Sequence, residues 1–579
     1  MANSVWILPE ISDEIKAKGK NISCTLGIPL IVAELMAERG ISNACEAEEF
    51  LNADLMDVKS PYLLTDMDKA VQRLIEAVKK GEKIRIYGDY DVDGVTSICI
   101  LMDVLGKLGA KTDYYIPDRV SEGYGVNPDA VFSAAEDGIS LMITVDCGIT
   151  ASSEVELART LGIDVIITDH HVPDKVIPAA IAVINPKRDD VNYPFYDLAG
   201  VGVAYKLASA LLAAIGNTQC SLNSPEDYLD FVALGTIADV CPLTKENRIF
   251  AKRGLERLSR TDNPGLKALI EICGLTDRAI TAGLVGFVIA PRLNAAGRIH
   301  DASLCTELLL TDSSEKAMSI AKLLDDINCK RQEMEMEIFE EALSMVKTVN
   351  GRPVDDILVL ANKRWHPGII GIVASRLVKE FNRPSIMVSL AGDEGRGSGR
   401  SIPGFNLYKA LSECSESLLH FGGHKNAAGI ILSHNKIDEF RQSINEIGRR
   451  VLKKDDFLPK IICHRELTLN EINLEIAESI AMMAPFGVQN PTPLFLSTGV
   501  KLEEYRGIGM GGRHLKLKLS QSGTVHDGIG FNLGHMVSTF YSHRINAVDL
   551  VYSIEINEWD GRIQPQLNIK DLRVTENYT

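Results

Sequence analysis

The sequence predicts an α/β protein built from several domains, and three observations carry this prediction. From residue 83 onward, short β-prone runs alternate with helical runs, which favours a mostly parallel sheet with helices on both faces. A second α/β region begins near residue 351, and short alternating strands fill the chain after about residue 462. The length of 579 residues suits about three to four domains.

The expected elements follow from local patterns. Residues 1–80 read as helices, including 28–40 and 66–81, and Gly81 suits a helix C-cap. Strands are expected at 83–87, 111–117, 141–145, 164–168 and 180–186, with helices at 94–109 and 152–162 between them. Helices cover roughly 200–350. The last of them has Asp312 and Glu315 as an N-terminal signature and runs about 35 residues, or about 50 Å. A helix of that length is expected to join two domains.

Five regions are therefore expected along the chain. They are an N-terminal helical region (1–80), an α/β domain with a helical extension (81–310), a connecting helix (311–350), a second α/β domain (351–455) and a small C-terminal β-barrel of the OB-fold type (462–579).

Composition limits the classes of function. The formal net charge of −17, from 61 basic and 78 acidic residues, argues against non-specific nucleic-acid binding by the whole surface, although a local basic channel fits within an acidic total. The eleven cysteines form no C-x-x-C pair, which indicates a reducing compartment. No run approaches the ~20 apolar residues that span a bilayer, and the N-terminus lacks a signal-peptide core. We expect a soluble cytoplasmic protein.

The stretch YGDYDVDGVTS (87–97) begins like an EF-hand calcium loop, with Asp89, Asp91 and Asp93 at positions one, three and five. Position twelve of that loop needs a bidentate Glu, and this chain has Ile100 there. The calcium-loop interpretation is therefore excluded. The aspartates instead lie where a strand gives way to a helix.

Acidic and imidazole side chains follow several expected strands. Ligands of open parallel sheets gather beyond the carboxyl ends of the strands. An aspartate there is, taken alone, more often a helix N-cap or turn former. Several carboxylates at one sheet edge, however, repel one another unless cations neutralise them. The residues at these positions are Asp89, Asp91, Asp93, Asp146, Asp169, His170, His171 and, after a fourth apolar segment, Asp239.

These motifs carry a family resemblance. In order and spacing, GDYDVDG, VDCGI, TDHH and GTIADVCPL resemble the four motifs of the DHH phosphoesterase superfamily. The later motifs APRLNAAGRI, WHPGIIGIVASRL, GSGRSIPGFNLYKAL, FGGHKNAAG and PFGVQNPTPLF resemble the RecJ family of single-stranded-DNA-specific exonucleases within it. The likeness extends from about residue 50 to near the C-terminus. It implies a DHH catalytic domain, a DHH-associated substrate-binding domain and a nucleic-acid-binding OB-fold.

The resemblance implies a phosphodiesterase with two Mn²⁺ or Mg²⁺ ions. Carboxylate-rich sites suit these ions, and the implied ligand set has no cysteine, which argues against structural zinc. Two ions would activate a shared water and stabilise the attacking and leaving oxygens. The implied ligands are Asp91, Asp93, Asp146, His170 and Asp239; His171 would contact the scissile phosphate or the departing oxygen, and Asp89 and Asp169 would orient ligands.

One position departs from the family pattern. Tyr87 stands where many relatives have His, and we place it beside the ligands. A neutral phenol is a poor substitute for imidazole, so we expect weaker occupancy of one metal site unless other ligands compensate.

Two further groups of residues are expected to hold DNA. The glycine-rich segment GDEGRGSGRS is expected to form a turn whose amides and side chains bind an anion, which the resemblance implies is a terminal 5′-phosphate. In the barrel, HLKLKL places its two lysines on one strand face, which suits sequence-tolerant binding of single strands. The resemblance makes Arg119, Arg298, Ser398, Arg400 and His424 candidates for the phosphate site, and Arg513, Lys516 and Lys518 candidates in the barrel.

The expected function is a 5′→3′ exonuclease that degrades single-stranded DNA to mononucleotides in repair and recombination. A hydrolase of short oligonucleotides or cyclic dinucleotides would use the same core, but the barrel weighs against it. An inactive replication or repair scaffold is the third reading, weakly favoured by Tyr87 and opposed by the retained ligands. Beyond single-stranded DNA, the implied partners are a RecQ-type helicase and a single-strand-binding protein, with the chain itself a monomer.

Overall fold

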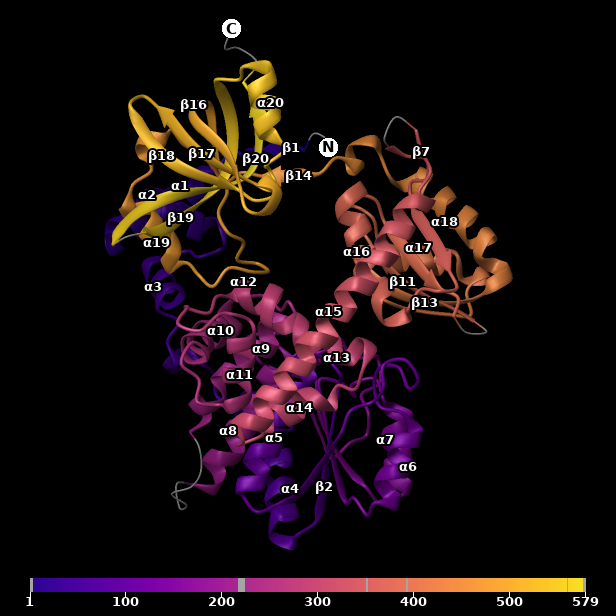
Figure 1. Ribbon diagram of the computed structural model, residues 1–579. Coiled ribbons are helices and arrows are strands. Elements are labelled where there is room, and N and C mark those ends of the chain that lie inside the picture. The colour runs from indigo at the N-terminus through magenta and orange to yellow at the C-terminus, as the bar shows by residue number, and fades with distance from the viewer. Residues whose placement is uncertain (1–3, 217–223, 350–351, 392–393, 560, 576–579) are drawn as a thin grey trace. The chain divides into compact units, whose positions relative to one another are not determined.

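The computed structural model describes residues 4–216, 224–349, 352–391, 394–559 and 561–575. The chain divides into two compact units (Figure 1). The first unit comprises residues Ser60–Cys241 and Gly254–Pro459, and the second comprises Ser4–Lys59, Pro242–Arg253 and Lys460–Thr579.

A parallel five-stranded sheet forms the centre of the first half of the first unit. Its strand order is β3-β2-β4-β5-β6, and the expected strands are confirmed with small changes at their ends. The burial pattern explains the order, because the central strands are apolar on both faces and helices cover both. The strands are β2 (Lys83–Gly88), β3 (Lys111–Tyr115), β4 (Leu141–Val145), β5 (Asp164–Thr168) and β6 (Ala182–Ile184).

Helices cover both faces of this sheet. Figure 1 shows α4 and α5 on one side of β2 and α6 and α7 on the other. Helices α8 and α9 pack against α5. The bounds are α4 (Met67–Lys80), α5 (Val92–Lys107), α6 (Pro128–Glu136), α7 (Ser152–Thr160), α8 (Gly200–Ile215), α9 (Leu229–Ala238), α10 (Lys245–Leu258), α11 (Pro264–Ile272), α12 (Ala282–Leu284), α13 (Ala290–Ile299) and α14 (Ser303–Leu310).

The strand order creates a switch point beside β2. The chain passes from β2 to β3 on one side and then returns to place β4 on the other side of β2. In open parallel sheets, the crevice beyond the carboxyl ends at such a point is where ligands bind. The loops after β2 and β4 carry Asp89, Asp91, Asp93 and Asp146, so the acidic motifs meet at this crevice.

The expected connecting helix is α15 (Ser314–Met345), which has 32 residues. Its N-cap is Ser313, whose side chain accepts a hydrogen bond from the Lys316 amide at 3.2 Å. The predicted N-terminal signature, with Asp312 as the cap and Glu315 three residues later, was therefore wrong by one residue. The Ser313 hydroxyl caps the helix instead.

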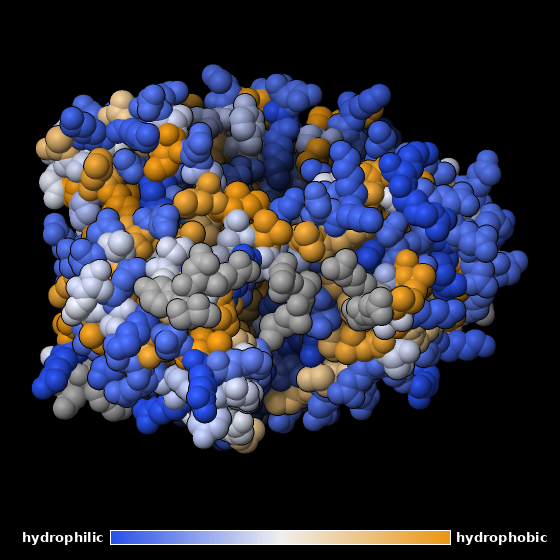
Figure 2. All heavy atoms as spheres, turned by 90° about the horizontal axis from the view of Figure 1, so that it is seen from above, coloured by the Kyte–Doolittle hydropathy of each residue, from blue (hydrophilic) through white to orange (hydrophobic). Residues whose placement is uncertain are grey.

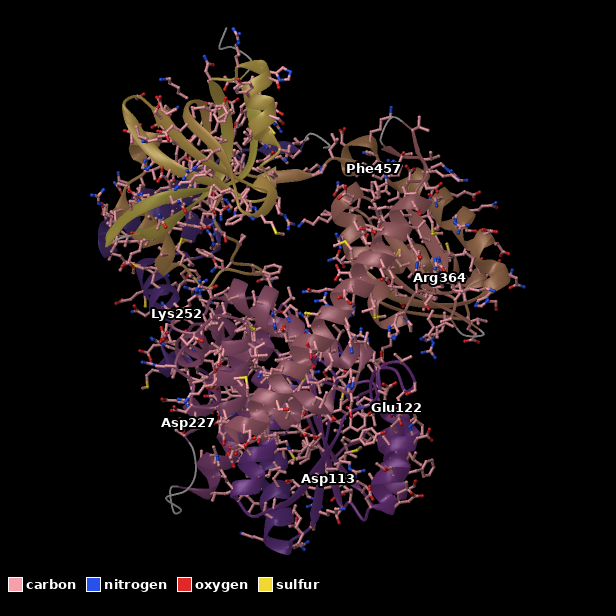
Figure 3. All side chains as sticks on the ribbon, in the orientation of Figure 1. Asp113, Glu122, Asp227, Lys252, Arg364 and Phe457 are labelled. Atoms are coloured by element: carbon pink, nitrogen blue, oxygen red, sulfur yellow. The ribbon has the colours of Figure 1, made fainter. Side chains whose placement is uncertain are left out.

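A second, mixed sheet follows α15 in the first unit, with strand order β12-β13-β11-β10-β9. Its core includes Ile386, Val388, Phe405 and Phe440. The Arg383 guanidinium lies 3.9 Å from the ring centroid of Phe457, which Figure 3 labels at this domain. The elements are the short pair β7 (Thr348–Val349) and β8 (Arg352–Pro353), then β9 (Leu358–Asn362), α16 (Pro367–Phe381), β10 (Ser385–Ser389), β11 (Glu394–Arg400), α17 (Leu407–Glu413), β12 (His420–Gly423), β13 (Ala427–Ser433) and α18 (Ile437–Val451).

The second unit contains the expected barrel. Strands β16, β17, β18, β20 and β19 pair in that order, and β16 also pairs with β19, which closes the ring. The elements are β1 (Val5–Ile7), α1 (Asp13–Leu26), α2 (Leu30–Glu38), α3 (Ala44–Asn52), β14 (Lys460–Ile462), β15 (Arg465–Glu466), α19 (Leu474–Met482), β16 (Phe495–Ile508), β17 (His514–Gln521), β18 (Thr524–Gly530), α20 (Met536–His543), β19 (Ala547–Trp559) and β20 (Arg562–Val574).

The N-terminal helices share one hydrophobic core with the barrel. Ile22, Leu35 and Met36 belong to the same buried cluster as Phe495 and Tyr552. Arg248 joins three parts of this unit, because its guanidinium donates to the carbonyls of residues 50, 483 and 484. The N-terminal region predicted at 1–80 is therefore divided, because residues 4–59 pack with the barrel whereas 60–80 belong to the first unit. Local patterns could not indicate this, since residues 59 and 460 lie some 400 residues apart in the sequence.

Figure 2 shows one face on which hydrophilic residues predominate and hydrophobic residues gather in small groups. Within the described ranges, no helix is both long enough and apolar enough to cross a bilayer.

Gly94, in the first turn of α5, provides a test of how tightly the β2–α5 loop is packed. A Cβ atom there would lie 2.4 Å from the Asp89 carbonyl oxygen and 2.7 Å from its amide nitrogen. Since backbone atoms cannot rotate away, we expect Gly94→Ala to lower the free energy of unfolding by about 1–3 kcal/mol. Chemical denaturation of purified protein measures the change.

Gly106, in the same helix, is the matched control. A Cβ atom there would have no neighbour within 4 Å, so Gly106→Ala should leave stability unchanged or raise it by up to about 1 kcal/mol through helix propensity. Equal destabilisation by the two substitutions would contradict the close packing described above.

Candidate metal centre and phosphate site

Backbone amides of two helices hold the first two carboxylates. Asp91 is the N-cap of α5, and its Oδ1 accepts hydrogen bonds from the amides of Asp93 and Gly94 at 2.9 and 3.1 Å. The carboxylate of Asp93 accepts from the amides of Gly200 and Val201, each at 2.8 Å, at the N-terminus of α8. The positive ends of both helices therefore stabilise negative charge at the end of β2.

Three further predicted ligands meet beside Asp93. The Nε2 atom of His170 lies 3.1 Å from Oδ1 of Asp146, 3.6 Å from Oδ2 of Asp239 and 3.8 Å from Oδ2 of Asp93. Asp146 follows β4 with φ 58°, a left-handed conformation that is uncommon for residues other than glycine. The structure thus brings these four predicted ligands together at the switch point.

Asp89 and Asp91 complete this group. Carboxylate oxygens of Asp89, Asp91 and Asp146 lie within 4.8 Å of one another. Asp89 was predicted to orient ligands. Its carboxylate lies among the candidate ligand atoms themselves, and its Oδ1 has no hydrogen-bond partner among the described residues.

The electrostatics of the cluster fit divalent cations. Asp89 Oδ1, Asp146 Oδ1 and His170 Nε2 are buried and have no hydrogen-bond partner within the described residues. Burial and then Asp93 raise the pKa of Asp146 well above its usual range, while burial lowers the pKa of His170, which favours neutral imidazole. Burial followed by repulsion from Asp239 raises the pKa of Asp93 to about 7. Burying such polar atoms without partners costs free energy unless a cation binds between them.

His171 is held at the edge of the cluster by Asp169. The Asp169 carboxylate accepts hydrogen bonds from the amides of Ile149, His170 and His171, and it lies 2.8 Å from Nδ1 of His171. Burial alone would lower the pKa of His171, but the Asp169 contact raises it to about 9. The Tyr124 hydroxyl lies 3.0 Å from the same nitrogen. Tyr124 was not predicted, because only the fold brings its loop to His171.

Tyr87 lies in the core beside the cluster. Its hydroxyl donates a hydrogen bond to the Gly125 carbonyl at 2.8 Å, and its ring stacks on Tyr115. Its side chain is therefore committed to the loop that follows β3. Glu122, labelled in Figure 3, supports the same loop by accepting from Tyr115 and Asn127.

One cysteine that was not among the predicted site residues lies beside the predicted ligands. The Sγ atom of Cys241 lies 3.0 Å from Oδ2 of Asp239 and donates to it. Cys241, Asp239 and His170 each offer a ligand atom within 4.8 Å of the other two. Burial raises the pKa of this thiol. The scattered spacing of cysteines in the sequence gave no indication of this contact.

Three arginines form a cationic cluster next to the carboxylates. Burial and then the charges of Arg119, Arg331 and Arg400 lower the pKa of Arg298 to about 10, and burial followed by the charge of Arg119 lowers the pKa of Arg400. Arg331 is paired with Glu335, whereas Arg119, Arg298 and Arg400 have no ion pair among the residues the structure describes. Like charges held together without carboxylate partners are typical of an anion site.

The segment around Ser398 does not form the predicted turn. It is β11, an interior strand that pairs antiparallel with both β10 and β13, so its backbone amides are part of the ladder and cannot form an anion nest. Glycine is needed there for packing, since a Cβ at Gly397 would lie 2.5 Å from Ile430. Only the side chains of this strand remain available to a ligand, and Arg400 donates a hydrogen bond to the Ser398 hydroxyl at 3.0 Å.

His424 lies in the turn between β12 and β13. It is exposed, and it comes three residues before Ala427, the register partner of Arg400. This places its backbone at the same end of the sheet as Arg400.

The predicted barrel lysines lie on a face of mixed charge. Leu515, Leu517 and Leu519 are buried, so Lys516 and Lys518 share the outer face of β17 as expected. The Lys518 ammonium lies 3.5 Å from Glu504, and Arg513 donates to Asn532 at 2.8 Å. A groove of about 550 Å³ on this face is lined by both signs of charge: Glu503, Glu504, Tyr505, Arg506, Lys516, Leu517, Lys518 and Asp527.

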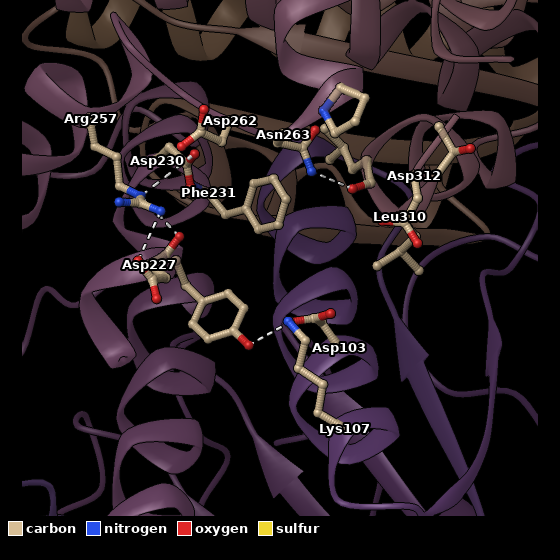
Figure 4. A pocket seen from close by; sticks show the side chains of 14 residues that line it. Asp103, Lys107, Asp227, Asp230, Phe231, Arg257, Asp262, Asn263, Leu310 and Asp312 are labelled. Atoms are coloured by element: carbon tan, nitrogen blue, oxygen red, sulfur yellow. Dashed lines mark hydrogen bonds and ion pairs between the residues drawn. The ribbon is translucent and has the colours of Figure 1, made fainter. Parts of the chain in front are cut away.

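A separate pocket of about 390 Å³ lies at the far end of α5 (Figure 4). Asp103 lies twelve residues after Asp91, about 18 Å along the helix at ~1.5 Å per residue. Its carboxylate pairs with Lys107 and accepts from Tyr228, and Arg257 pairs with Asp227. Because these acids are satisfied, the pocket lacks the orphaned atoms that mark the metal centre.

Comparison with known proteins gives one consistent result. Residues 83–236 match the model of the DHH family N-terminal domain, residues 355–449 match the DHHA1 domain, and residues 463–571 match the RecJ OB domain.

Full-length relatives agree with these matches. The chain is 41% identical over 570 residues to a single-stranded-DNA-specific exonuclease RecJ of Bacillus subtilis, covering 98% of this chain and 71% of the relative. It is 36% identical to the Escherichia coli protein of the same name, covering 94% and 96%. The crystal structure of RecJ in complex with Mn²⁺ from Thermus thermophilus superposes with a TM-score of 0.83 at 30% identity, covering 99% of this chain and 80% of that one.

Proposed function

This chain belongs to the RecJ family of single-stranded-DNA-specific exonucleases, and we propose that it removes nucleotides from the 5′ end of single-stranded DNA. The proposal depends most on one observation, the adjacency of the carboxylate cluster and the arginine cluster. Arg119 acts electrostatically on Asp89, and Arg298 on Asp91. A terminal phosphate bound by the arginines would therefore leave the neighbouring phosphodiester close to the carboxylates.

Tyr90 connects the two clusters. It lies between Asp89 and Asp91 in sequence, and the Arg119 guanidinium stacks 4.7 Å from its ring centroid. Helix α13 packs closely on it, since a Cβ at Gly297 would lie 2.5 Å from the Tyr90 carbonyl oxygen. The next residue of α13 is Arg298. One loop therefore fixes the spacing between end recognition and hydrolysis, which supports release of mononucleotides.

Mn²⁺ or Mg²⁺ would be held by Asp89, Asp91, Asp93, Asp146, His170 and Asp239. When bound, two such cations lower the pKa of a water and stabilise the attacking and leaving oxygens. The amides of α8 orient Asp93, and Asp169 fixes the ring of His171. With its pKa raised to about 9, His171 holds a proton at Nδ1 or Nε2 that the departing oxygen can accept. The 2-residue spacing of Asp89 and Asp91 keeps both carboxylates on one loop.

The barrel is proposed to hold the strand beyond the cleavage site. Lys516, Lys518 and Arg513 would contact phosphates, and the neighbouring acids would limit the affinity. A barrel of this kind favours long single strands over cyclic dinucleotides. We further propose that the protein works as a cytoplasmic monomer, with a RecQ-type helicase and a single-strand-binding protein as partners in repair and recombination.

Asp146→Asn tests the metal centre. The substitution keeps the side-chain shape and removes the charge that four other carboxylates oppose, so we expect Mn²⁺-dependent hydrolysis of a 5′-labelled single strand to fall more than a hundredfold, with DNA binding still measurable. Asp129→Asn, on the exposed face of α6, is the control and should leave the rate unchanged. Retention of a tenth of the activity by Asp146→Asn, about 1.4 kcal/mol of barrier, would falsify the role.

Arg400→Ala tests end recognition. The wild type should cut a 5′-phosphorylated strand faster than a 5′-hydroxyl strand, because the arginine cluster binds the terminal charge. The substitution should reduce this preference at least about tenfold, in line with the loss of one charge-assisted hydrogen bond. Arg364→Ala, which removes a guanidinium paired with Glu341 and labelled in Figure 3, should keep the preference. Equal wild-type rates on the two strands would remove the reason for a phosphate site.

A double substitution of Lys516 and Lys518 by Ala tests the barrel. If both ammonium groups neutralise phosphates, the slope of log K against log salt for a long single strand, which is negative, should become shallower by about 1.4. Lys16 and Lys18, in α1 of the same unit, provide a control of equal charge change. Binding titrations at several salt concentrations measure the slopes. Substitution is preferred to deletion of 462–579, because deletion would expose the core shared with α1 and α2.

A further inference from the structure

Cys241 lies at the rim of the metal centre and has no role in the function proposed above. It follows Asp239 by two residues, and the intervening Val240 has φ 60° and is 66% exposed. A β-branched residue rarely adopts that conformation, so the turn is strained. The turn leaves Val240 in solvent, while the Cys241 thiol is buried and donates a hydrogen bond to Asp239 at 3.0 Å.

The thiol is part of a triad of different donor types. A nitrogen of His170, a carboxylate oxygen of Asp239 and Sγ of Cys241 lie within 4.8 Å of one another. His170 is only 6% exposed, and its Nε2 makes no hydrogen bond within the described residues, although it lies 3.1 Å from Asp146 Oδ1 and 3.6 Å from Asp239 Oδ2. This buried nitrogen without a hydrogen bond lies between Asp146 and Asp239, and it is a second indication, independent of the thiol, that a cation binds at this end of the triad.

The donor set differs from the rest of the centre in softness. Asp89, Asp91, Asp93 and Asp146 offer oxygen, which suits Mn²⁺ and Mg²⁺. Sulfur, nitrogen and oxygen from three side chains, with a position left for water, are the ligands of many Zn²⁺ sites. With an oxygen-preferring ion in the centre, the thiol keeps its proton and its hydrogen bond to Asp239.

We propose that Cys241, His170 and Asp239 form a site for a thiophilic divalent cation such as Zn²⁺, and that this cation inhibits the enzyme. On binding, the S–H bond breaks, a metal–sulfur bond forms and the proton passes to water. Because His170 and Asp239 are shared, the thiophilic cation removes two ligands from the Mn²⁺ or Mg²⁺ centre. The inhibition rests on the proposed function, whereas the cation site does not.

Cd²⁺ is the probe for the site, since its bond to thiolate gives a charge-transfer absorption band. The full chain is titrated with CdCl₂ after Cys24, Cys45 and Cys329, which are exposed, and Cys220, which lies outside the described residues, have been replaced by serine. We expect a band that Cys241→Ser reduces by the amplitude of one thiolate. Cys305→Ala, at another buried cysteine, should retain the band. Cooperative melts establish that each variant is folded.

Zn²⁺ titrations of hydrolysis at fixed Mn²⁺ provide the second readout. Each variant is normalised to its own activity without Zn²⁺, and Cys241→Ser should raise the half-inhibitory Zn²⁺ concentration at least about tenfold, as expected for loss of a ligand. An unchanged Cd²⁺ band in folded Cys241→Ser overturns the site. A Cys241-dependent band with equal Zn²⁺ inhibition overturns the inhibitory mechanism. A Cys241-dependent band in a protein with no Mn²⁺-dependent hydrolysis supports the site and contradicts the proposed function.

Discussion

Mutual repulsion among buried carboxylates is the constraint on which the first unit depends. Asp93 and Asp146 are almost fully buried beside Asp89, and burial raises the pKa of each. Two helix N-termini reduce this cost, because the amides of α5 bind Asp91 and those of α8 bind Asp93. Close packing is required as well, since a Cβ at Gly200 would lie 2.7 Å from the Asp146 carboxylate. Sheet, helix ends and glycines are thus arranged around one concentration of negative charge.

The position of this centre could be predicted from sequence, because it follows from topology. Carboxyl ends of parallel strands meet at one edge, so Asp91, Asp146 and His170 had to lie near one another once the strands were recognised. Side-chain direction was less accessible. Asp89, which follows β2, lies among the candidate ligand atoms, whereas Tyr87, near the end of β2, stacks in the core. Period-two alternation does not extend into the loop, so it could not separate these two roles.

Contacts between distant segments were the part that the sequence could not supply. The glycine-rich strand β11 was predicted as a turn, because a glycine-rich sequence suits both a turn and a tightly packed interior strand. The packing of Ile430 on β13 against this segment favours the strand, and Ile430 is distant in sequence. Cys241 and Tyr124 reach the centre only through the fold. The shared core of Leu35 and Phe495 similarly joins chain ends that no local pattern connects.

The energetics of the metal centre also bear on whether this protein is an active enzyme or an inactive scaffold. Orphaned Asp89 Oδ1, Asp146 Oδ1 and His170 Nε2 each cost free energy in a cation-free protein, and a scaffold would gain stability by replacing them with apolar or neutral side chains. A cation turns that cost into binding free energy. The carboxylate cluster is therefore expected to gain stability from a bound cation, and the arginine cluster beside it, whose guanidiniums have no ion pair in the described part of the chain, is expected to gain stability from a bound anion. Opposite unsatisfied charges held apart by one tyrosine suit a phosphodiester substrate better than a passive surface.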